Sequence, residues 1–295
     1  MSTEPSAALG GERPSEAPPN SQSDAPPDRT TDRTTDLVIT DHGAVREIAL
    51  NRPQTKNGLT DELFIGLRVA FEDAAKDDKV RAVLLTGRGG SFCSGLDLKA
   101  AMAMVQASAG NFSDSLEDRL REVLHRLIRS MVGNPKPIIA LVDGAAAGFG
   151  CDLALCCDLR IGTARARFGE IFIKRGLMPD GGGTYTLPRL VGVGRAFDML
   201  LTGDVVESDE ALRIGLLSRI VKDADEGLAL AQRIAAGPPL VLREIKRAVW
   251  AGLEAPLDAA LEREAKGQLQ LLRSQDFIEG ITAFLMKRPP VFSGQ

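Results

Sequence analysis

Two glycine-containing turns organise this chain: SFCSGLDLK at residues 91–99 and DGAAAGFGCD at residues 143–152. Each turn follows a short apolar run, at 80–86 and at 137–142, which predicts a buried strand. Each also precedes a segment of helical character, and glycine allows the backbone to turn sharply and to approach a ligand closely. Two such turns can direct two backbone N–H groups at one oxygen atom. That arrangement is an oxyanion hole, which stabilises negative charge on a carbonyl oxygen.

Other uses of these glycines have less support. Neither turn contains the phosphate-loop pattern G-x-x-x-x-G-K-[ST], and Gly148-Phe149-Gly150 lacks the third glycine of a dinucleotide-binding turn. Taken singly, either turn could simply connect a strand to a helix in an α/β protein. The presence of both in this order favours the oxyanion hole, and a helix that begins near Phe149 would add the positive end of its dipole.

The chain resembles the crotonase superfamily, or enoyl-CoA hydratase/isomerase family, from about residue 36 to the C-terminus. Besides the two turns, the matching stretches are NRP at 51–53 with Asn57, CDLRI at 157–161, FG at 168–169, GLMPDGGGT at 176–184 and LLTG at 200–203. The resemblance implies a spiral of ββα units and a helical C-terminal region that covers the active site and forms trimers, often paired into hexamers. It also implies an acyl-CoA thioester substrate, as in fatty acid metabolism, and no cofactor, because coenzyme A is part of the substrate.

The predicted elements follow an α/β order. Strands are predicted at 36–40, 45–50, 80–86, 137–142, 159–162 and 166–168, and helices at 60–76, at 116–132 and from 149. Helical spacing then continues through 229–236, 240–253, 256–273 and 274–287. Residues 1–35 are rich in Pro, Ser, Thr and acidic residues, a composition that predicts a disordered tail. The expected division is this tail, a core at 36–228 and a helical region at 229–295.

The composition is that of a soluble enzyme. The chain of 295 residues has a net charge of −4, which gives no reason to expect a nucleic-acid partner. No apolar run approaches the roughly 18 residues that cross a bilayer. The N-terminus has neither the basic start nor the apolar core of a secretory signal. We therefore expect a cytoplasmic protein without a membrane partner.

Nucleophiles and metal ligands are few. The four cysteines all lie in apolar or glycine-rich segments without C-x-x-C spacing: Cys93, Cys151, Cys156 and Cys157. This pattern predicts reduced core thiols rather than disulfides or a metal site. The two histidines, His42 and His125, stand near no nucleophile elbow, so a Ser-His-Asp hydrolase is not expected.

The resemblance assigns roles around the two turns. The oxyanion donors would be the backbone N–H groups of Leu96, after Gly95, and of Phe149, after Gly148. Ser94 would lie in the substrate-binding turn. Asp97 matches the acidic position after this turn, and the simpler interpretation is that its carboxylate fixes the loop or the following helix.

The carboxylates separate the possible reactions. Family hydratases carry two glutamates that share one water, and this chain has Asp152 at the first position and Phe172 at the second. A phenyl ring cannot activate water. Glu170 lies two residues earlier, an offset of about 6.6 Å on an extended segment. We therefore expect Glu170 to be solvated or ion-paired, for example with Lys174 or Arg175.

Asp180, in MPDGGGT, is the preferred acid/base group. In the isomerase branch of the family an acidic residue at this Pro-Asp/Glu position looks like the proton shuttle. Isomerisation needs one base, which removes a proton from one carbon and returns it to another. A helix N-cap or Asx turn is the structural alternative for Asp180. Asp152 is either a second acid/base group or a residue that orients substrate.

Coenzyme A requires cations for its phosphates. The resemblance assigns this role to a set of basic residues, the last of which would reach a neighbouring subunit: Arg52, Lys56, Lys99 and Lys287. The segment 100–114 is predicted to be an irregular loop that forms the acyl pocket.

The favoured function is an acyl-CoA isomerase that shifts a double bond through a thioester enolate. One alternative is an enoyl-CoA hydratase that uses Asp152 with Asp180 or Glu170. The other is a non-catalytic acyl-CoA-binding protein whose acid/base pair has decayed.

Overall fold

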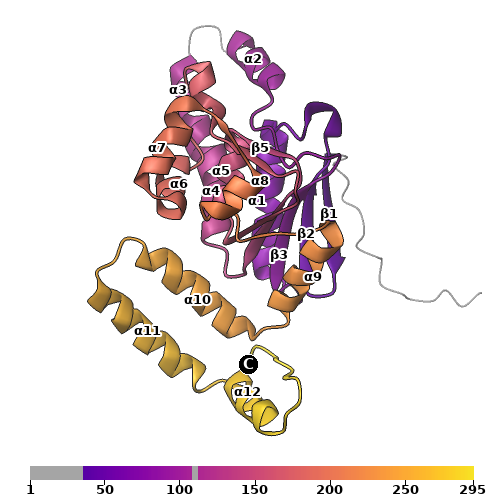
Figure 1. Cartoon of the computed structure of the whole chain (residues 1–295), viewed down its shortest axis with the longest axis vertical. Coiled ribbons are helices and arrows are strands. Elements are labelled where there is room, and N and C mark those ends of the chain that lie inside the picture. The colour runs from indigo at the N-terminus through magenta and orange to yellow at the C-terminus, as the bar shows by residue number, and fades with distance from the viewer. Residues whose placement is uncertain (1–35, 108–111) are drawn as a thin grey trace, which may run out of the picture. The chain divides into compact units, whose positions relative to one another are not determined.

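The computed structural model of the chain describes residues 36–107 and 112–295 (Figure 1). The predicted tail at 1–35 lies outside the described residues, as does the part of the predicted acyl-pocket loop at 108–111. Among the described residues, no helix is both long and apolar enough to span a membrane.

The main sheet has six strands in the order β1-β2-β3-β4-β6-β9. Their bounds are β1 Leu37–His42, β2 Val45–Leu50, β3 Ala82–Gly87, β4 Ile138–Val142, β6 Leu159–Gly162 and β9 Arg219–Ile220. β1 and β2 form an antiparallel hairpin, and every later pairing is parallel. Parallel strands are covered on both faces, which explains why β3 and β4 read as continuous apolar runs.

Helices cover both faces of this sheet (Figure 1). α1 (Asp61–Lys76) is capped by Thr60, whose hydroxyl accepts the Leu63 N–H, and it buries Phe64 and Phe71 against one face. α9 (Ala224–Ala235) covers the other face. The predicted division at 228–229 falls inside α9, so the helices beyond the sheet begin with α10.

A second, three-stranded sheet connects the main sheet to the segments that form the site. Its strands are β5 (Ala145–Ala147), β7 (Arg167–Gly169) and β8 (Val205–Glu207), in that order. The chain leaves β4 for β5 at Gly144, where φ is 78° and a Cβ would lie 2.2 Å from the Gly90 oxygen. Only glycine fits both the conformation and the space. α5 (Phe149–Leu155) follows β5 directly and is buried along its whole length.

The remaining helices flank the second sheet or follow the core. They are α2 Leu98–Ala107, α3 Phe112–Arg119, α4 His125–Val132, α6 Gly183–Val191, α7 Val193–Thr202, α8 Ser208–Arg213, α10 Pro239–Gly252, α11 Leu257–Leu271 and α12 Gln275–Leu285. Short turns are η1 Pro53–Thr55, η2 Leu120–Leu124 and η3 Ile171–Arg175. α10 is joined to the core by Asp158, which pairs with Lys246 at 2.8 Å and accepts the Trp250 indole N–H at 2.8 Å.

Two predicted segments differ from the structure. The expected irregular loop is helical over α2, because the Asp97 carboxylate accepts N–H groups of its first turn. The helix predicted at 116–132 is interrupted by η2, a π-helical turn between α3 and α4. Such turns have one extra residue per turn and often occur at functional sites.

Candidate active site

The two turns meet at a pocket of about 390 Å³. Its walls come from the turns, the start of α1, η2, η3 and the segment before α6: Gln54, Thr55, Gly58, Phe64, Ser94, Gly95, Leu96, Asp97, Leu98, Lys99, Leu124, Gly148, Phe149, Ile171, Phe172, Arg175, Leu177 and Asp180. The predicted oxyanion donors and the predicted acid/base group Asp180 therefore line one pocket.

Backbone hydrogen bonds hold the two turns against each other. The Cys93 N–H donates to the Ala145 oxygen and the Ala147 N–H donates to the Cys93 oxygen, both at 2.9 Å. Gly95 has φ 87°, and a Cβ there would lie 2.7 Å from the Ala147 oxygen and 3.2 Å from the Phe149 nitrogen. Any side chain at residue 95 would push the turns apart.

The two predicted donor groups have no acceptor among the described residues. The Leu59 N–H donates to the Gly95 oxygen, and the Leu59 oxygen accepts the Asp97 N–H. Leu59 therefore bonds to the residues on either side of Leu96, and the Leu96 N–H points away from Leu59. Phe149 is the first residue of α5, where an N–H has no partner within the helix. Both groups fit the predicted oxyanion hole.

Asn57 fixes the first turn, although the sequence marked it only as a family match. It is fully buried, and its amide donates to the backbone oxygens of Arg88, Ser91 and Phe92 at 3.0, 2.6 and 3.2 Å. Its side-chain oxygen accepts the Arg52 N–H at 2.8 Å. Its backbone is left-handed, φ 60°, a conformation that asparagine adopts more readily than most residues.

Asp97 and Arg52 form an ion pair at the edge of the pocket, with 3.1 Å between their nearest atoms. Arg52 also pairs with Asp36 at 3.1 Å. Burial disfavours the charged form of Asp97, but the N–H groups of Ala100 and Lys99 and the Arg52 guanidinium outweigh it, so the pKa of Asp97 is lowered. The Asp97 carboxylate thus fixes the start of the following helix, as its simpler interpretation expects. A contact of Arg52 with coenzyme A stays a prediction.

The other predicted binding residues fall into two groups. Ser94 lines the pocket, and its hydroxyl donates to the Thr55 oxygen at 3.0 Å. Gly148 also lines it, with φ 54°. Lys99 is exposed at the rim. Lys56 and Lys287 are exposed but do not line the pocket, so their contacts with substrate stay predictions.

Asp180 is the half-buried carboxyl group of the pocket. One of its oxygens is buried without a hydrogen-bond partner. Burial raises its pKa, although the nearby charges of Arg119 and His125 lower it in part. The N-cap of α6 is Gly182 and no side chain caps that helix, so the alternative of a helix cap does not apply to Asp180.

Asp152 supports the segment that carries Asp180. It is fully buried and does not line the pocket. One oxygen accepts the Gly181 N–H at 2.8 Å, and a Cβ on Gly183 would lie 2.2 Å from the other. Glycine is therefore required where this turn closes over the carboxylate. Burial first, and then the charge of Glu170, raise the pKa of Asp152 well above its ordinary value.

The expectation that Glu170 is solvated or ion-paired is wrong. Its side chain is 1% exposed, and neither carboxylate oxygen has a hydrogen-bond partner or an ion pair among the described residues. Lys174 and Arg175 are exposed. Burial raises the pKa of Glu170 to about 7. Phe172, two residues later, lines the pocket.

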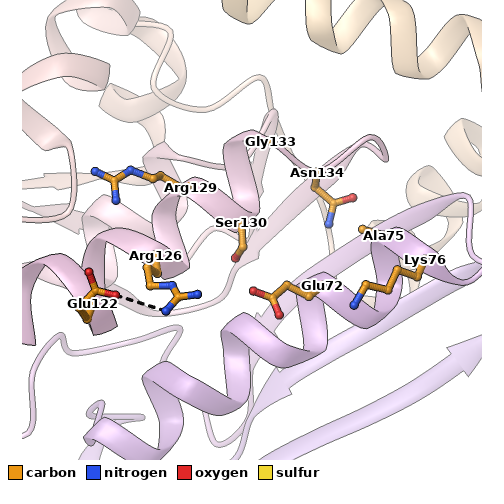
Figure 2. A pocket seen from close by; sticks show the side chains of 9 residues that line it. All are labelled: Glu72, Ala75, Lys76, Glu122, Arg126, Arg129, Ser130, Gly133 and Asn134. Atoms are coloured by element: carbon orange, nitrogen blue, oxygen red, sulfur yellow. Dashed lines mark hydrogen bonds and ion pairs between the residues drawn. The ribbon is translucent and has the colours of Figure 1, made fainter.

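A second hollow, of about 540 Å³, lies between α1 and α4 (Figure 2). It is lined by Glu72, Ala75, Lys76, Glu122, Arg126, Arg129, Ser130, Gly133 and Asn134. Its charges have both signs, and Arg126 pairs with Glu122 at 3.3 Å. It contains none of the predicted catalytic groups, so the pocket at the two turns is the candidate active site.

Comparisons with known proteins agree with this geometry. A family model described as enoyl-CoA hydratase/isomerase matches residues 40–295. A Rhodobacter capsulatus protein named "Probable enoyl-CoA hydratase" is 41% identical over 251 residues, 84% of this chain and 94% of that protein. A 1,2-epoxyphenylacetyl-CoA isomerase of Escherichia coli is 37% identical over 254 residues, 85% and 95% of the two chains. The crystal structure of an enoyl-CoA hydratase from Bacillus anthracis superposes with a TM-score of 0.82 at 30% identity, covering 88% of this chain and 100% of that one.

Proposed function

Because the chain belongs to the enoyl-CoA hydratase/isomerase family, we propose that it is an acyl-CoA isomerase that moves a double bond through a thioester enolate. Its relatives carry names of both reactions, hydration and isomerisation. The choice between them therefore depends on the acid/base groups of the pocket.

The observation that carries the proposal is the unequal placement of Asp180 and Phe172. Both line the pocket, and Phe172 stands where the family's second hydratase glutamate is expected. The other carboxylate among the described lining residues, Asp97, is paired with Arg52. Asp180 is thus left as the acid/base group that faces substrate. One such group is sufficient for isomerisation but not for the shared-water mechanism of a two-glutamate hydratase.

The proposed steps use groups that line the pocket. The N–H groups of Leu96 and Phe149 bind the thioester oxygen of the substrate. Asp180 removes a proton from carbon, the electrons move to that oxygen as the enolate forms, and the two N–H groups stabilise the charge. Asp180 then returns the proton to a different carbon of the conjugated system, which restores the thioester and leaves the double bond moved.

Lys99 and Arg175 support substrate binding, because both line the pocket and are exposed. A positive charge at this rim suits the phosphates of coenzyme A. The proposal also includes a homotrimer or hexamer. It is supported by apolar side chains on and just after α12 that are largely exposed in one chain: Phe284 at 81%, Leu285 at 74% and Met286 at 67%.

Hydration is the second candidate, because Asp180 lies close enough to Asp152 and Glu170 for its charge to raise the pKa of both. A water molecule held between Asp180 and one of these groups would have two acid/base partners. Against it, neither Asp152 nor Glu170 lines the pocket. An acyl-CoA-binding protein without catalysis is the remaining alternative, and it predicts no proton exchange at all.

One experiment separates the three. The protein is incubated in heavy water with a panel of 2-enoyl-, 3-enoyl- and aryl-acyl-CoA thioesters, and the products are analysed by mass spectrometry. We expect deuterium uptake and a moved double bond without added water. A hydrated product would replace the isomerase proposal by the hydratase. Binding of the thioesters without any exchange would contradict both enzymes.

A further inference from the structure

Glu170 is a buried carboxyl group without a task in the proposed reaction. Seven buried side-chain nitrogen and oxygen atoms among the described residues lack a hydrogen-bond partner, and four of them belong to Asp152, Glu170 and Asp180. Glu170 contributes both of its oxygens, at 1% exposure. Unpaired buried polar atoms are costly, so their concentration behind one pocket requires an explanation.

Among the described residues, the groups that act on Glu170 supply no positive charge. The described groups that act on it or feel its charge are the thiols of Cys151 and Cys156, and the carboxyls of Asp152 and Asp180. Arg119 and His125 lower the pKa of Asp180 but do not act on that of Glu170. Three ionised carboxylates in one buried cluster would repel one another strongly.

Protonation of one member removes this conflict. An ionised carboxylate only accepts hydrogen bonds, whereas a neutral carboxylic acid also has an O–H donor. Asp152 already accepts the Gly181 N–H at 2.8 Å, which favours its ionised form. Glu170 has no N–H donor among the described residues. The Cys151 thiol is the one described group that favours the ionised form of Glu170 by a hydrogen bond, and burial outweighs it. As a neutral acid Glu170 gains an O–H that can bond to an unpaired oxygen of its neighbours.

We propose that Glu170 is a positioning residue, which in its neutral acid form donates a hydrogen bond within the carboxyl cluster and keeps Asp180 ionised and correctly placed. This inference rests on the proposed role of Asp180 as proton shuttle. The Glu170 proton stays on Glu170 throughout the reaction. Ionisation of Glu170 would add a negative charge near the forming enolate, so turnover falls as the pH rises through the pKa of Glu170, about 7.

The position of the proton can be measured without substrate. Infrared difference spectra of the wild type between about pH 5 and about pH 9 should show the C=O band of a neutral buried carboxylic acid that disappears as the pH rises. The component of this band that titrates near pH 7 should be absent from Glu170→Gln. Lack of a band in the wild type, or an unchanged band in Glu170→Gln, would place the proton elsewhere and overturn the proposal.

The role at Asp180 is tested by the pH profile of turnover. Glu170→Gln keeps a neutral donor, so we expect turnover near neutral pH to fall by only about threefold and the alkaline decline to disappear, whereas Glu170→Ala should lose at least about tenfold. Glu207→Gln is the matched control. Glu207 is an exposed glutamate of β8, paired with Arg167 at 2.9 Å, and its variant should keep the wild-type profile.

An active wild type whose alkaline decline survives in Glu170→Gln contradicts this inference alone. A wild type that exchanges no proton with any thioester contradicts the proposed function, and with it the role of Glu170 at Asp180. The two failures are therefore distinguishable. Thermal unfolding of each variant shows whether a loss of activity reflects a loss of folded protein.

Discussion

The two halves of the candidate site are built by different means. The oxyanion half consists of backbone groups, and the glycines that shape it have neighbours too close to admit a side chain, such as the Ala147 oxygen at Gly95. The acid/base half consists of carboxyl groups of Asp152, Glu170 and Asp180, with four buried oxygens that lack partners. Backbone hydrogen bonds stabilise the first half, whereas burial of carboxyls costs stability in the second. Under the proposed function, the costly half serves the reaction rather than the fold.

The largest expected effect is that of Asp180→Asn. This change keeps the shape of the side chain and removes the base, so turnover should fall by about 10³-fold while affinity for a CoA thioester changes little. Steady-state kinetics and calorimetric titration measure the two quantities. Asp204→Asn, at an exposed aspartate, is the control. Turnover within about tenfold of the wild type would remove Asp180 from its proposed role.

A smaller effect is expected in the backbone half. Gly95→Ala should lower turnover by about 10²-fold, because a Cβ 2.7 Å from the Ala147 oxygen displaces the Leu96 N–H. Leu96→Met keeps that N–H and should change turnover less than about threefold. Gly194→Ala is the control, since its Cβ would meet no heavy atom within 4 Å. If Leu96→Met were as damaging as Gly95→Ala, the side chain rather than the N–H would be important.

The smallest effect concerns stability. The pKa of Glu170 rises from 4.5 to about 7 on folding, so the folded protein binds more protons than the unfolded chain between these values. The free energy of unfolding should therefore fall as the pH rises through this window, by about 3 kcal/mol. Urea denaturation of the wild type, Glu207→Gln and Glu170→Gln measures it. Only Glu170→Gln should lose this component, and an unchanged slope would show that another group carries the proton.

The backbone half could be predicted from sequence because its signals are local. Gly95 and Gly148 stand between an apolar run and a helix, and both adopt the positive φ that such turns need. The core strands β3 and β4 could also be predicted, because each is a local run of apolar residues in the sequence. The donor geometry of Leu96 depends on one strand contact, with Leu59, that the sequence did not reveal.

The carboxyl half was predicted only in part. Asp180 was placed by its family match, but Glu170 was assigned to solvent by counting residues along an extended strand. The chain is not extended there, because β7 ends at Gly169 and η3 begins at Ile171. Glu170 is the residue between them, and its side chain is directed into the core rather than along a strand face. A change of backbone conformation at one residue is enough to invalidate a count based on period two.

Apolar periodicity and glycine positions act over a few neighbouring residues, so the family, the α/β fold and the two turns could be predicted without the structure. The tertiary structure alone decided which side chains meet. It placed Asp180 at the pocket wall, Asp152 beneath the Gly181 to Gly183 turn and Glu170 in the core beside α5. Charge repulsion and burial depend on distances between segments far apart in the chain, so the chemistry of these carboxyls emerges only when the segments pack together.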